Sequence, residues 1–422
     1  MMDFDWKNIE IYDDDLDDMD IIKKIIGRND QDDPFYIFDV EDIVKKHKQW
    51  LTKMPRIVPH FAVKSNPDPT VIKILAALNA SFDCASMQEI QLVMNMGVTN
   101  DRIIYANPIK APSHIEFAKK VGVDRTVVDT KEEVLKLKEL HPNAKLLIRI
   151  AIDGSAEKCG VNFSGKFGCK STDEAIELMK FIKIQKMYLL GFSFHLGSPC
   201  WDTTSYGKGI EICKDLIKTA RDMGHLETRL IDIGGGIDGT DKDYFNEVAA
   251  SVNAALEDVD PSIEIISEPG RYYVDTSFTL SARIIGKKII NQEKMKKKIY
   301  YINEGTYGSF IEELLDLRQR IPISLYNQPS DEKFPSVIWG RTCDSCDVVI
   351  KNELMQDFNI DDWMIWRNMG AYTISNATVF NGYTLAGVKP FIRKGSLKYI
   401  STVIDEIQGK NNNHISTEQS DN

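Results

Sequence analysis

The stretch PHFAVKSNPDPTVIKILAALNASFD, residues 59–83, contains the repeating unit that decides the fold. Its apolar run at 59–63 has the length of a buried strand, and a second short run follows at 81–83. Between them, the segment 68–78 carries apolar residues at the spacing of one helix face: Val71, Ile74, Leu75 and Leu78. A strand, a helix and a second strand in this order predict a βαβ unit with parallel strands.

The same alternation continues from about residue 35 to about residue 275. The apolar runs are 35–39, 59–63, 81–83, 103–106, 125–129, 145–150, 189–194, 229–233 and 263–267. The helix-like segments are 68–78, 87–96, 113–121, 131–140, 172–183, 204–223 and 241–257. About eight such units in about 240 residues favour an α/β fold of the (β/α)₈ TIM-barrel type over an open sheet.

The sequence pattern changes after about residue 278, where runs typical of β-strands replace the alternation of strand-like and helix-like segments. These runs are 279–285, 298–302, 336–339, 348–350 and 362–366. We therefore expect a barrel at 36–277 and a C-terminal all-β domain, residues 278–408, completed by the N-terminal residues 1–35. The polar stretch 409–422 lacks an apolar period and is expected to form a disordered tail.

Composition narrows the class of protein. The 422 residues carry 52 Lys and Arg against 63 Asp and Glu, a formal charge of −11, which disfavours nucleic acid and anionic lipid as partners. No apolar run is long enough to cross a bilayer, and the acidic N-terminal sequence does not resemble a secretory signal. The seven cysteines predict reduced thiols in the cytoplasm, and the single Cys343/Cys346 pair predicts no zinc or other metal site.

Four groups of reactive residues end predicted barrel strands, which is where barrel enzymes place their active sites. Lys64 could be a Schiff-base former or a surface charge, and His195 a ring-facing group or a core histidine. The glycines at 234–236 could cradle a phosphate or form a tight turn. In the segment 267–272, Glu268 and Arg271 could bind opposite ends of an anionic cofactor or form an ordinary ion pair.

The four groups in this order supply what a protein must provide for pyridoxal 5′-phosphate. These are an imine-forming amine, a group that stacks on the ring, a phosphate cradle and a partner for the pyridine nitrogen. The glycine run lacks both the GxGxxG spacing and the Walker lysine, so neither a dinucleotide site nor an NTPase site is indicated.

The chain resembles the eukaryotic-type ornithine decarboxylases, which are fold-type III, alanine-racemase-like enzymes that use pyridoxal phosphate. The resemblance covers residues from about 34 to 393. It rests on the motifs FAVKSN (61–66), FDCAS (82–86), RIIYANP (102–108), FHLGS (194–198), DIGGG (232–236), EPGRYYV (268–274), YGSF (307–310), WGRTCDSCD (339–347) and NMGAYT…FNGY (368–383).

The resemblance implies roles for the cofactor-binding residues. Lys64 forms the Schiff base with pyridoxal phosphate, His195 stacks on the ring, and Glu268 keeps the pyridine nitrogen protonated. Asp83 and Arg149 lie beside the Schiff base. The residues implied to hold the phosphate and its surroundings are Ser198, Gly234, Gly235, Gly236, Gly270, Arg271 and Tyr372.

The resemblance also implies the substrate end of the site and its regulation. Cys343 protonates the carbon that has lost carbon dioxide, while Asp316 and Asp344 bind the distal amine of the substrate in a slot lined by Tyr307 and Phe380. In the family, Cys343 and Asp344 reach the site of the other subunit, so a homodimer with shared sites is expected. Two further expectations are a subunit-bridging pair, Lys166 with Asp347, and antizyme binding at 113–140, where a solvated helix face is the alternative.

Departures from the family pattern leave the substrate open. The segment 311–320 lacks the usual aromatic residue at Leu315 and the usual histidines after Asp316, and 237–239 replaces a Phe-Pro-Gly. The implied activity is decarboxylation of L-ornithine to putrescine in polyamine biosynthesis. The alternatives are a decarboxylase for lysine, arginine or another amino acid, and an inactive binding protein like the antizyme inhibitors. Racemase chemistry is disfavoured, because alanine racemases place an arginine where Glu268 stands.

Overall fold

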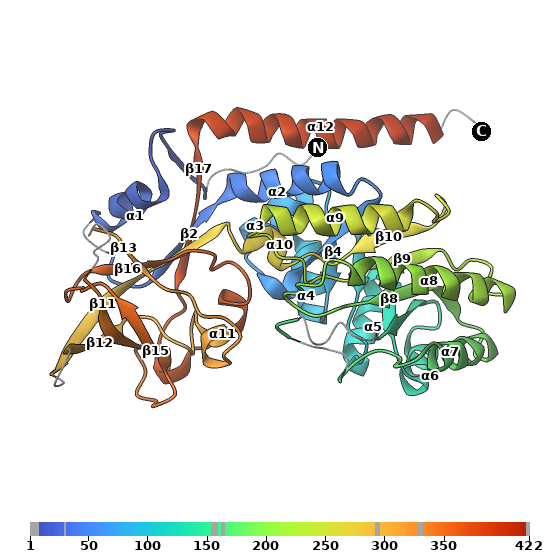
Figure 1. Cartoon of the computed structure of the whole chain (residues 1–422). Coiled ribbons are helices and arrows are strands. Elements are labelled where there is room, and N and C mark those ends of the chain that lie inside the picture. Colours follow the sequence, from blue (N-terminus) through green and yellow to red (C-terminus); the bar gives the residue numbers. More distant parts are fainter. Residues whose placement is uncertain are drawn as a thin grey trace. The chain divides into compact units, whose positions relative to one another are not determined.

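The computed structural model describes residues 8–28, 31–152, 159–161, 165–291, 296–326 and 332–418 (Figure 1). The chain divides into two compact units. The β unit consists of Met1–Ile43 and Val274–Gly409, and the barrel unit consists of Val44–Tyr273 with Lys410–Asn422.

The barrel unit contains the closed parallel barrel that the sequence predicts. Around the barrel the strands follow the order β10-β3-β4-β5-β6-β7-β8-β9, so that the last strand closes onto the first. The strands are β3 (Ile57–Ala62), β4 (Ser81–Cys84), β5 (Ile103–Tyr105), β6 (Arg125–Val128), β7 (Lys145–Ile150), β8 (Tyr188–Phe194), β9 (Leu230–Asp232) and β10 (Glu264–Ser267). The predicted (β/α)₈ fold class is thereby confirmed.

Helices alternate with these strands along the chain (Figure 1). They are α2 (Val40–Lys53), α3 (Pro69–Ala77), α4 (Met87–Asn95), α5 (Pro112–Val121), α6 (Lys131–Leu140), α7 (Thr172–Ile184), α8 (Ser205–Asp222), α9 (Lys242–Leu256) and α10 (Arg271–Val274), with short 3₁₀ turns at η1 (Val63–Ser65) and η2 (Asn100–Arg102). Several helices begin at a side chain that accepts amide hydrogen bonds of the first turn, as Asp68, Ser86, Thr130, Ser171 and Asp241 do.

Apolar side chains fill the barrel, so it is a packed core and not a channel. One buried cluster takes a residue from each of six strands: Ile104, Val127, Leu147, Leu190, Leu230 and Ile266. With the interior occupied in this way, the strand ends and the loops that follow them are left to carry chemistry.

The β unit is a mixed sheet of nine strands among the described residues. Its main order is β1-β17-β2-β11-β12-β14-β15, while β16 pairs with β11 and with β13. The strands are β1 (Glu10–Tyr12), β2 (Phe35–Asp39), β11 (Phe278–Asn291), β12 (Lys296–Ile302), β13 (Ile323–Ser324), β14 (Phe334–Trp339), β15 (Val348–Met355), β16 (Trp363–Trp366) and β17 (Gly387–Arg393). Helices α1 (Asp18–Ile26) and α11 (Ile311–Leu314) and the 3₁₀ turns η4 (Ile374–Asn376) and η5 (Phe380–Gly382) also belong to it. The predicted participation of N-terminal residues is confirmed, because β1 and β2 both join this sheet.

Two expectations differ from the structure. The run 35–39, which the sequence analysis counts with the barrel strands, is β2 and pairs with β11 and β17 of the mixed sheet. A wholly buried apolar run has the same pattern in a barrel and in a covered sheet, which explains the misassignment. The final helix α12 (Lys394–Glu418) extends past residue 408 into the predicted disordered tail, where no proline interrupts it.

Candidate active site

Lys64 lies just past the carboxyl end of β3, in η1. Its Nζ donates a hydrogen bond to Oδ2 of Asp83, which lies on the neighbouring strand β4. The Lys64 side chain is 38% exposed, whereas that of Asp83 is 1% exposed. The parallel register pairs Ala62 with Asp83, and this places the amine and the carboxylate side by side. The lysine is therefore anchored at one side and open at the other.

Two more acids lie at the carboxyl ends of the neighbouring strands β9 and β10, and β10 pairs with β3. Asp232 ends β9, and Glu268 follows β10, where its amide donates to the Gly234 carbonyl at 2.7 Å. Burial raises the pKa of Glu268 well above its usual range, and the nearby carboxylates of Asp232 and Asp83 raise it further, against the lowering effect of Lys64 and Arg149. Three acids thus face two cations, and in the absence of a further cation the buried carboxyl of Glu268 favours its protonated, uncharged form.

His195 follows β8 and is held as a neutral imidazole. Its Nδ1 accepts a hydrogen bond from the Gly197 amide at 3.1 Å, so the proton of the neutral ring lies on Nε2. Desolvation lowers the pKa of His195 well below its usual range, and the cations of Arg149 and Lys64 lower it further. An uncharged flat ring beside two cations and the acid cluster suits contact with an aromatic cofactor.

The three glycines after β9 form a buried turn that admits no side chains. Gly234 and Gly236 have φ values of +66° and +87°, and a Cβ on Gly236 would lie 1.9 Å from the Gly197 carbonyl oxygen. A Cβ on Gly235 would lie 2.3 Å from the Glu268 carbonyl oxygen. Among the described residues, the amides of Gly235 and Gly236 meet no acceptor. Such a turn offers two backbone N–H groups to an anion.

These residues fit pyridoxal phosphate. Ser198 and Arg271 are buried in the segments that follow β8 and β10, so they can add a hydroxyl and a guanidinium to the glycine amides. A Cβ on Gly270 would come within 2.8 Å of the Ser65 side chain, so the Glu268–Arg271 corner packs directly behind the Lys64 turn. A protonated ring nitrogen at Glu268 would supply the positive charge that the acid cluster lacks.

A second cluster forms in the β unit. The Tyr307 hydroxyl donates to Oδ2 of Asp344, and the rings of Tyr307 and Phe380 lie 4.6 Å apart. The hydrogen bond from Tyr307 lowers the pKa of Asp344 and raises that of Tyr307 to about 12, so Asp344 is an anion beside a neutral phenol. Cys343 is an exposed free thiol whose amide donates to Oδ1 of Asn381 at 3.1 Å. Four predicted residues therefore meet here: a thiol, a carboxylate and two rings.

Asp316 does not join this cluster through any contact that the structure gives. It lies after α11 with a left-handed backbone, φ +53°, and its Oδ1 is 2.5 Å from Nζ of Lys351. Both side chains are mostly exposed, at 74% for Asp316 and 62% for Lys351. The aspartate that the family resemblance assigns to the substrate amine already has a lysine partner in this chain.

Tyr372 and Asp347 also belong to the β unit. Tyr372 is half-buried and has a left-handed backbone with φ +56°. Asp347 is fully buried, and its two oxygens accept hydrogen bonds from the amides and hydroxyls of Thr306 and Thr342 at 2.7–2.9 Å. The expected pairing of Asp347 with Lys166 across subunits stays a prediction, and within its own chain this carboxylate holds the two threonines. Lys166 lies over the Phe167 ring, 4.9 Å from its centroid.

Two further residues shape the glycine turn: Asp232, to which the DIGGG motif alone assigns no role, and Tyr206, which no motif marks. Asp232 accepts the Gly234 amide at 2.9 Å, and the fully buried Tyr206 donates from its hydroxyl to the Gly235 carbonyl at 3.0 Å. The position of Asp232 immediately before the glycine run was an available signal. Tyr206 is one apolar-face residue of α8 among several, so no local signal marks it.

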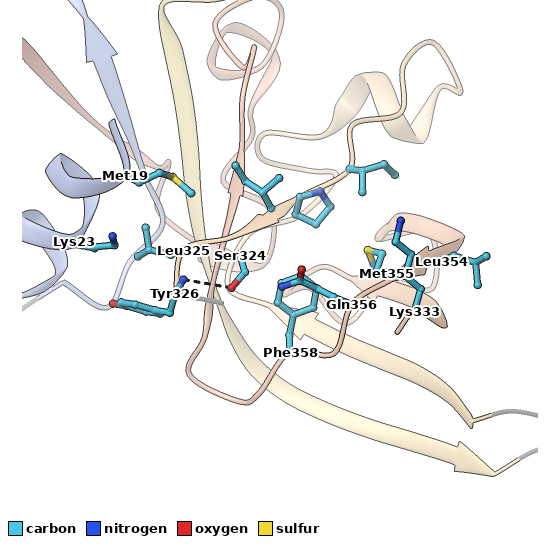
Figure 2. Close-up of a pocket in the computed structure, with 13 residues that line it drawn as sticks. Met19, Lys23, Ser324, Leu325, Tyr326, Lys333, Leu354, Met355, Gln356 and Phe358 are labelled. Atoms are coloured by element: carbon cyan, nitrogen blue, oxygen red, sulfur yellow. Dashed lines mark hydrogen bonds between the residues drawn. The ribbon is translucent and has the colours of Figure 1, made fainter. Parts of the chain in front are cut away.

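The β unit also contains an open hollow of about 470 Å³ that none of the predicted site residues lines (Figure 2). Figure 2 shows its rim, where Met19 and Lys23 of α1 lie near Leu325 and Tyr326, and Leu354 and Lys333 lie at the opposite end.

No helix among the described residues is long and apolar enough to cross a membrane.

Comparisons with known proteins agree with this geometry. Residues 40–275 match the family described as "Pyridoxal-dependent decarboxylase, pyridoxal binding domain". Antizyme inhibitor 2 of Xenopus laevis is 39% identical over 384 residues, which cover 86% of this chain and 83% of that protein. Ornithine decarboxylase of Mus musculus is 39% identical over 377 residues, which cover 85% of this chain and 80% of the mouse protein.

Two solved structures are similar over most of the chain. The arginine decarboxylase of Paramecium bursaria Chlorella virus, bound to agmatine, is 32% identical with a TM-score of 0.83, covering 89% of this chain and 100% of the other. The lysine/ornithine decarboxylase of Vibrio vulnificus, complexed with cadaverine, is 30% identical with a TM-score of 0.79, covering 89% and 99%. The chain therefore belongs to the eukaryotic-type ornithine decarboxylase family of fold-type III enzymes, and it is an amino-acid decarboxylase that uses pyridoxal 5′-phosphate.

Proposed function

We propose that this enzyme decarboxylates L-ornithine to putrescine and carbon dioxide, as a cytoplasmic homodimer in polyamine biosynthesis. The observation that carries the proposal is the pairing of two chemistries in one chain. The barrel unit has a lysine against a buried acid cluster, and the β unit has an anionic carboxylate beside two aromatic rings. A diamino acid presents a carboxylate for removal at one end and a cation at the other, which matches these two sites.

When bound, pyridoxal phosphate supplies an electron sink for the electron pair that carbon dioxide leaves behind. Lys64 would hold the cofactor through Nζ, and Asp83 orients that amine. Glu268 holds a proton on the ring nitrogen, because its burial beside other acids makes a full positive partner favourable. His195 would cover one face of the ring as a neutral group.

The phosphate belongs at the glycine turn. The amides of Gly235 and Gly236 would donate to the phosphate oxygens, and Ser198, Arg271 and Tyr372 would add side-chain donors. These contacts fix the cofactor at the end remote from the reacting carbon. Binding of the phosphate would thereby help to orient the bond between the α-carbon and the carboxylate of the substrate, which must break.

The β-unit cluster selects the substrate. Asp344 binds the distal ammonium group, Tyr307 and Phe380 shield its methylene chain, and Cys343 delivers a proton to the carbon that has lost its carboxylate. We propose that this cluster completes the barrel site of the partner subunit in a two-fold dimer. Asp316 contributes less than Asp344, because Lys351 already neutralises it.

The test is the release of labelled carbon dioxide from purified holoenzyme supplied separately with ornithine, lysine and arginine. The proposal expects ornithine to give the highest kcat/KM. A preference for lysine or arginine would replace the substrate while leaving the decarboxylase assignment intact. The Lys64→Ala variant is the blank, and Lys120→Ala, which changes an exposed lysine of α5, is the matched control.

The similarity to an antizyme inhibitor supports a second candidate, a protein that binds antizyme through 113–140 without catalysis. Absorbance separates the two candidates. An enzyme shows a lysine-bound cofactor band that borohydride removes, whereas a binder shows none at saturating pyridoxal phosphate. The intact lysine, acid cluster and glycine turn favour the enzyme.

A further inference from the structure

Two cysteines lie opposite each other beside the proposed phosphate cradle. Cys159 and Cys200 form an isolated antiparallel β-bridge between the segment 159–161 and the turn that follows β8. Directly opposed residues of an antiparallel bridge have Cα atoms about 4.5–5.5 Å apart, which lies within the range that a disulfide spans.

The side chains converge as the backbones do. The Cys159 and Cys200 thiols are hydrogen-bonded to each other, and the Cys159 thiol also donates to the Leu196 carbonyl at 3.2 Å. The hydrogen bond to Cys200 and burial raise the pKa of Cys159, which therefore rests as a thiol. Cys200 is fully buried and Cys159 is half-buried, so a reagent reaches the sulfur of Cys159 first.

Backbone hydrogen bonds connect the Cys159–Cys200 bridge to the residues around the glycine turn. The Gly160 amide donates to the Pro199 carbonyl at 2.9 Å, and the amides of Val161 and Ser198 each donate to the other's carbonyl at 3.1 Å. On the far side, the Cys200 amide donates to the Gly236 carbonyl at 3.0 Å. One short path therefore runs from Cys159 through Cys200 to the third glycine.

We propose that Cys159 and Cys200 are a disulfide-forming pair, and that their oxidation ties the segment 159–161 to the turn that carries Ser198 and holds Gly236. A disulfide of the glutathione type is the oxidant. The Cys159 sulfur, as its thiolate, attacks the reagent and releases one reduced thiol; the Cys200 sulfur then attacks the mixed disulfide and releases the second. Two protein thiols are oxidised, one reagent disulfide is reduced to two thiols, and the two protons of the protein thiols end on those products.

The link to cofactor retention rests on the proposed function, because it takes this turn to be the phosphate site. A disulfide between Cys159 and Cys200 would keep the β-bridge between them closed. The turn at 198–200 could then no longer move away from the segment 159–161. We expect the oxidised holoenzyme to release pyridoxal phosphate severalfold more slowly than the reduced holoenzyme.

The experiment treats the full-length holoenzyme with oxidised glutathione, blocks the remaining thiols and maps the peptides without reduction. The expected product is a peptide pair that joins Cys159 to Cys200. It should vanish in Cys159→Ser and persist in Cys169→Ser, which removes another buried thiol whose neighbour is Asp129. Mapping of the unchanged protein decides the point even where a variant fails to fold.

Three results would overturn the inference. The first is recovery of both cysteines as blocked thiols after the exposed Cys343 and Cys346 have been oxidised, and the second is Cys159 bound only to glutathione. The third, a linked pair with unchanged cofactor release measured in a pyridoxal phosphate trap, removes the tie to the cradle. Because thiol–disulfide exchange between these two cysteines requires no pyridoxal phosphate, failure of the proposed function would leave the disulfide result standing.

Discussion

The candidate site residues of the two units differ in burial and in acidity. The barrel unit buries an acid cluster around a lysine, so that Glu268 is 7% exposed and its pKa is far above the usual range. The β unit presents Cys343 at the surface and leaves Asp344 as an ordinary, easily ionised acid. Buried groups can alter the electronics of a cofactor, whereas exposed groups can select and release a flexible cation. The proposed function therefore assigns the chemistry to the barrel and the selection of substrate to the β unit.

The largest effect is expected when the barrel lysine is removed. Lys64→Ala should lower kcat by about 10³-fold or more, in the range for loss of a catalytic group, and should abolish the lysine-bound cofactor band. The band is read by absorbance before and after borohydride. A variant that keeps both the band and the activity would contradict the barrel half of the comparison.

Glu268→Gln tests whether the buried acid acts electronically. We expect about 10²–10⁴-fold lower kcat with cofactor still bound, because an amide cannot hold the ring proton as a carboxylate does. Glu264→Gln is the matched control, since it changes the same residue type at the other end of β10, where Glu264 pairs with Arg125. Equal losses in the two variants would indicate damage to the strand instead.

Mixing two inactive variants tests whether one subunit's β unit serves its partner's barrel. Lys64→Ala and Cys343→Ala subunits, mixed in equal amounts, should recover about a quarter of the original activity. Half of the dimers are hybrids, and each hybrid has one intact site of two. Activity that stays at the level of the unmixed variants would show that each site is built from one chain.

Within the β unit, the two aspartates should differ. Asp344→Asn should raise KM for ornithine about 10- to 100-fold, the cost of losing a hydrogen bond to a charged group. Asp316→Asn should raise it less, because an exposed ion pair with Lys351 already occupies that carboxylate. Steady-state kinetics on both variants decide the order, and the reverse order would return Asp316 to the substrate end.

The smallest effect concerns the cofactor-free protein. Because the pKa of Glu268 is raised on folding, the native state keeps a proton that the unfolded state loses above its pKa of about 4.5. The free energy of unfolding should therefore fall as pH rises through this window, by at most about 1.4 kcal/mol per pH unit. Glu268→Gln should flatten part of this slope in urea titrations, and a slope equal to that of the unchanged protein would contradict the prediction.

The barrel half of the molecule could be predicted from sequence more completely than the β half. Lys64, His195 and Glu268 each follow a periodic apolar run, and barrel geometry places all strand ends at one edge. The β-unit residues lie on loops whose meeting depends on long-range pairing. The pairing of Asp316 with Lys351, 35 residues away, left no local pattern. Strand β2 was misassigned for the same reason, because its sheet partners come from residues 278–281 and 387–391.

Asp347 fastens two loops with one carboxylate. Its oxygens accept hydrogen bonds from Thr306 and Thr342. Thr306 directly precedes Tyr307, and Thr342 lies two residues before Asp344. The buried side chain of Asp347 therefore fixes the separation between the Tyr307 hydroxyl and the Asp344 carboxylate. In the proposed slot, adaptation to a longer or shorter amine would fall to residues that Asp347 does not hold, such as Phe380, because a change at Asp347 would loosen the loops of Tyr307 and Asp344 together.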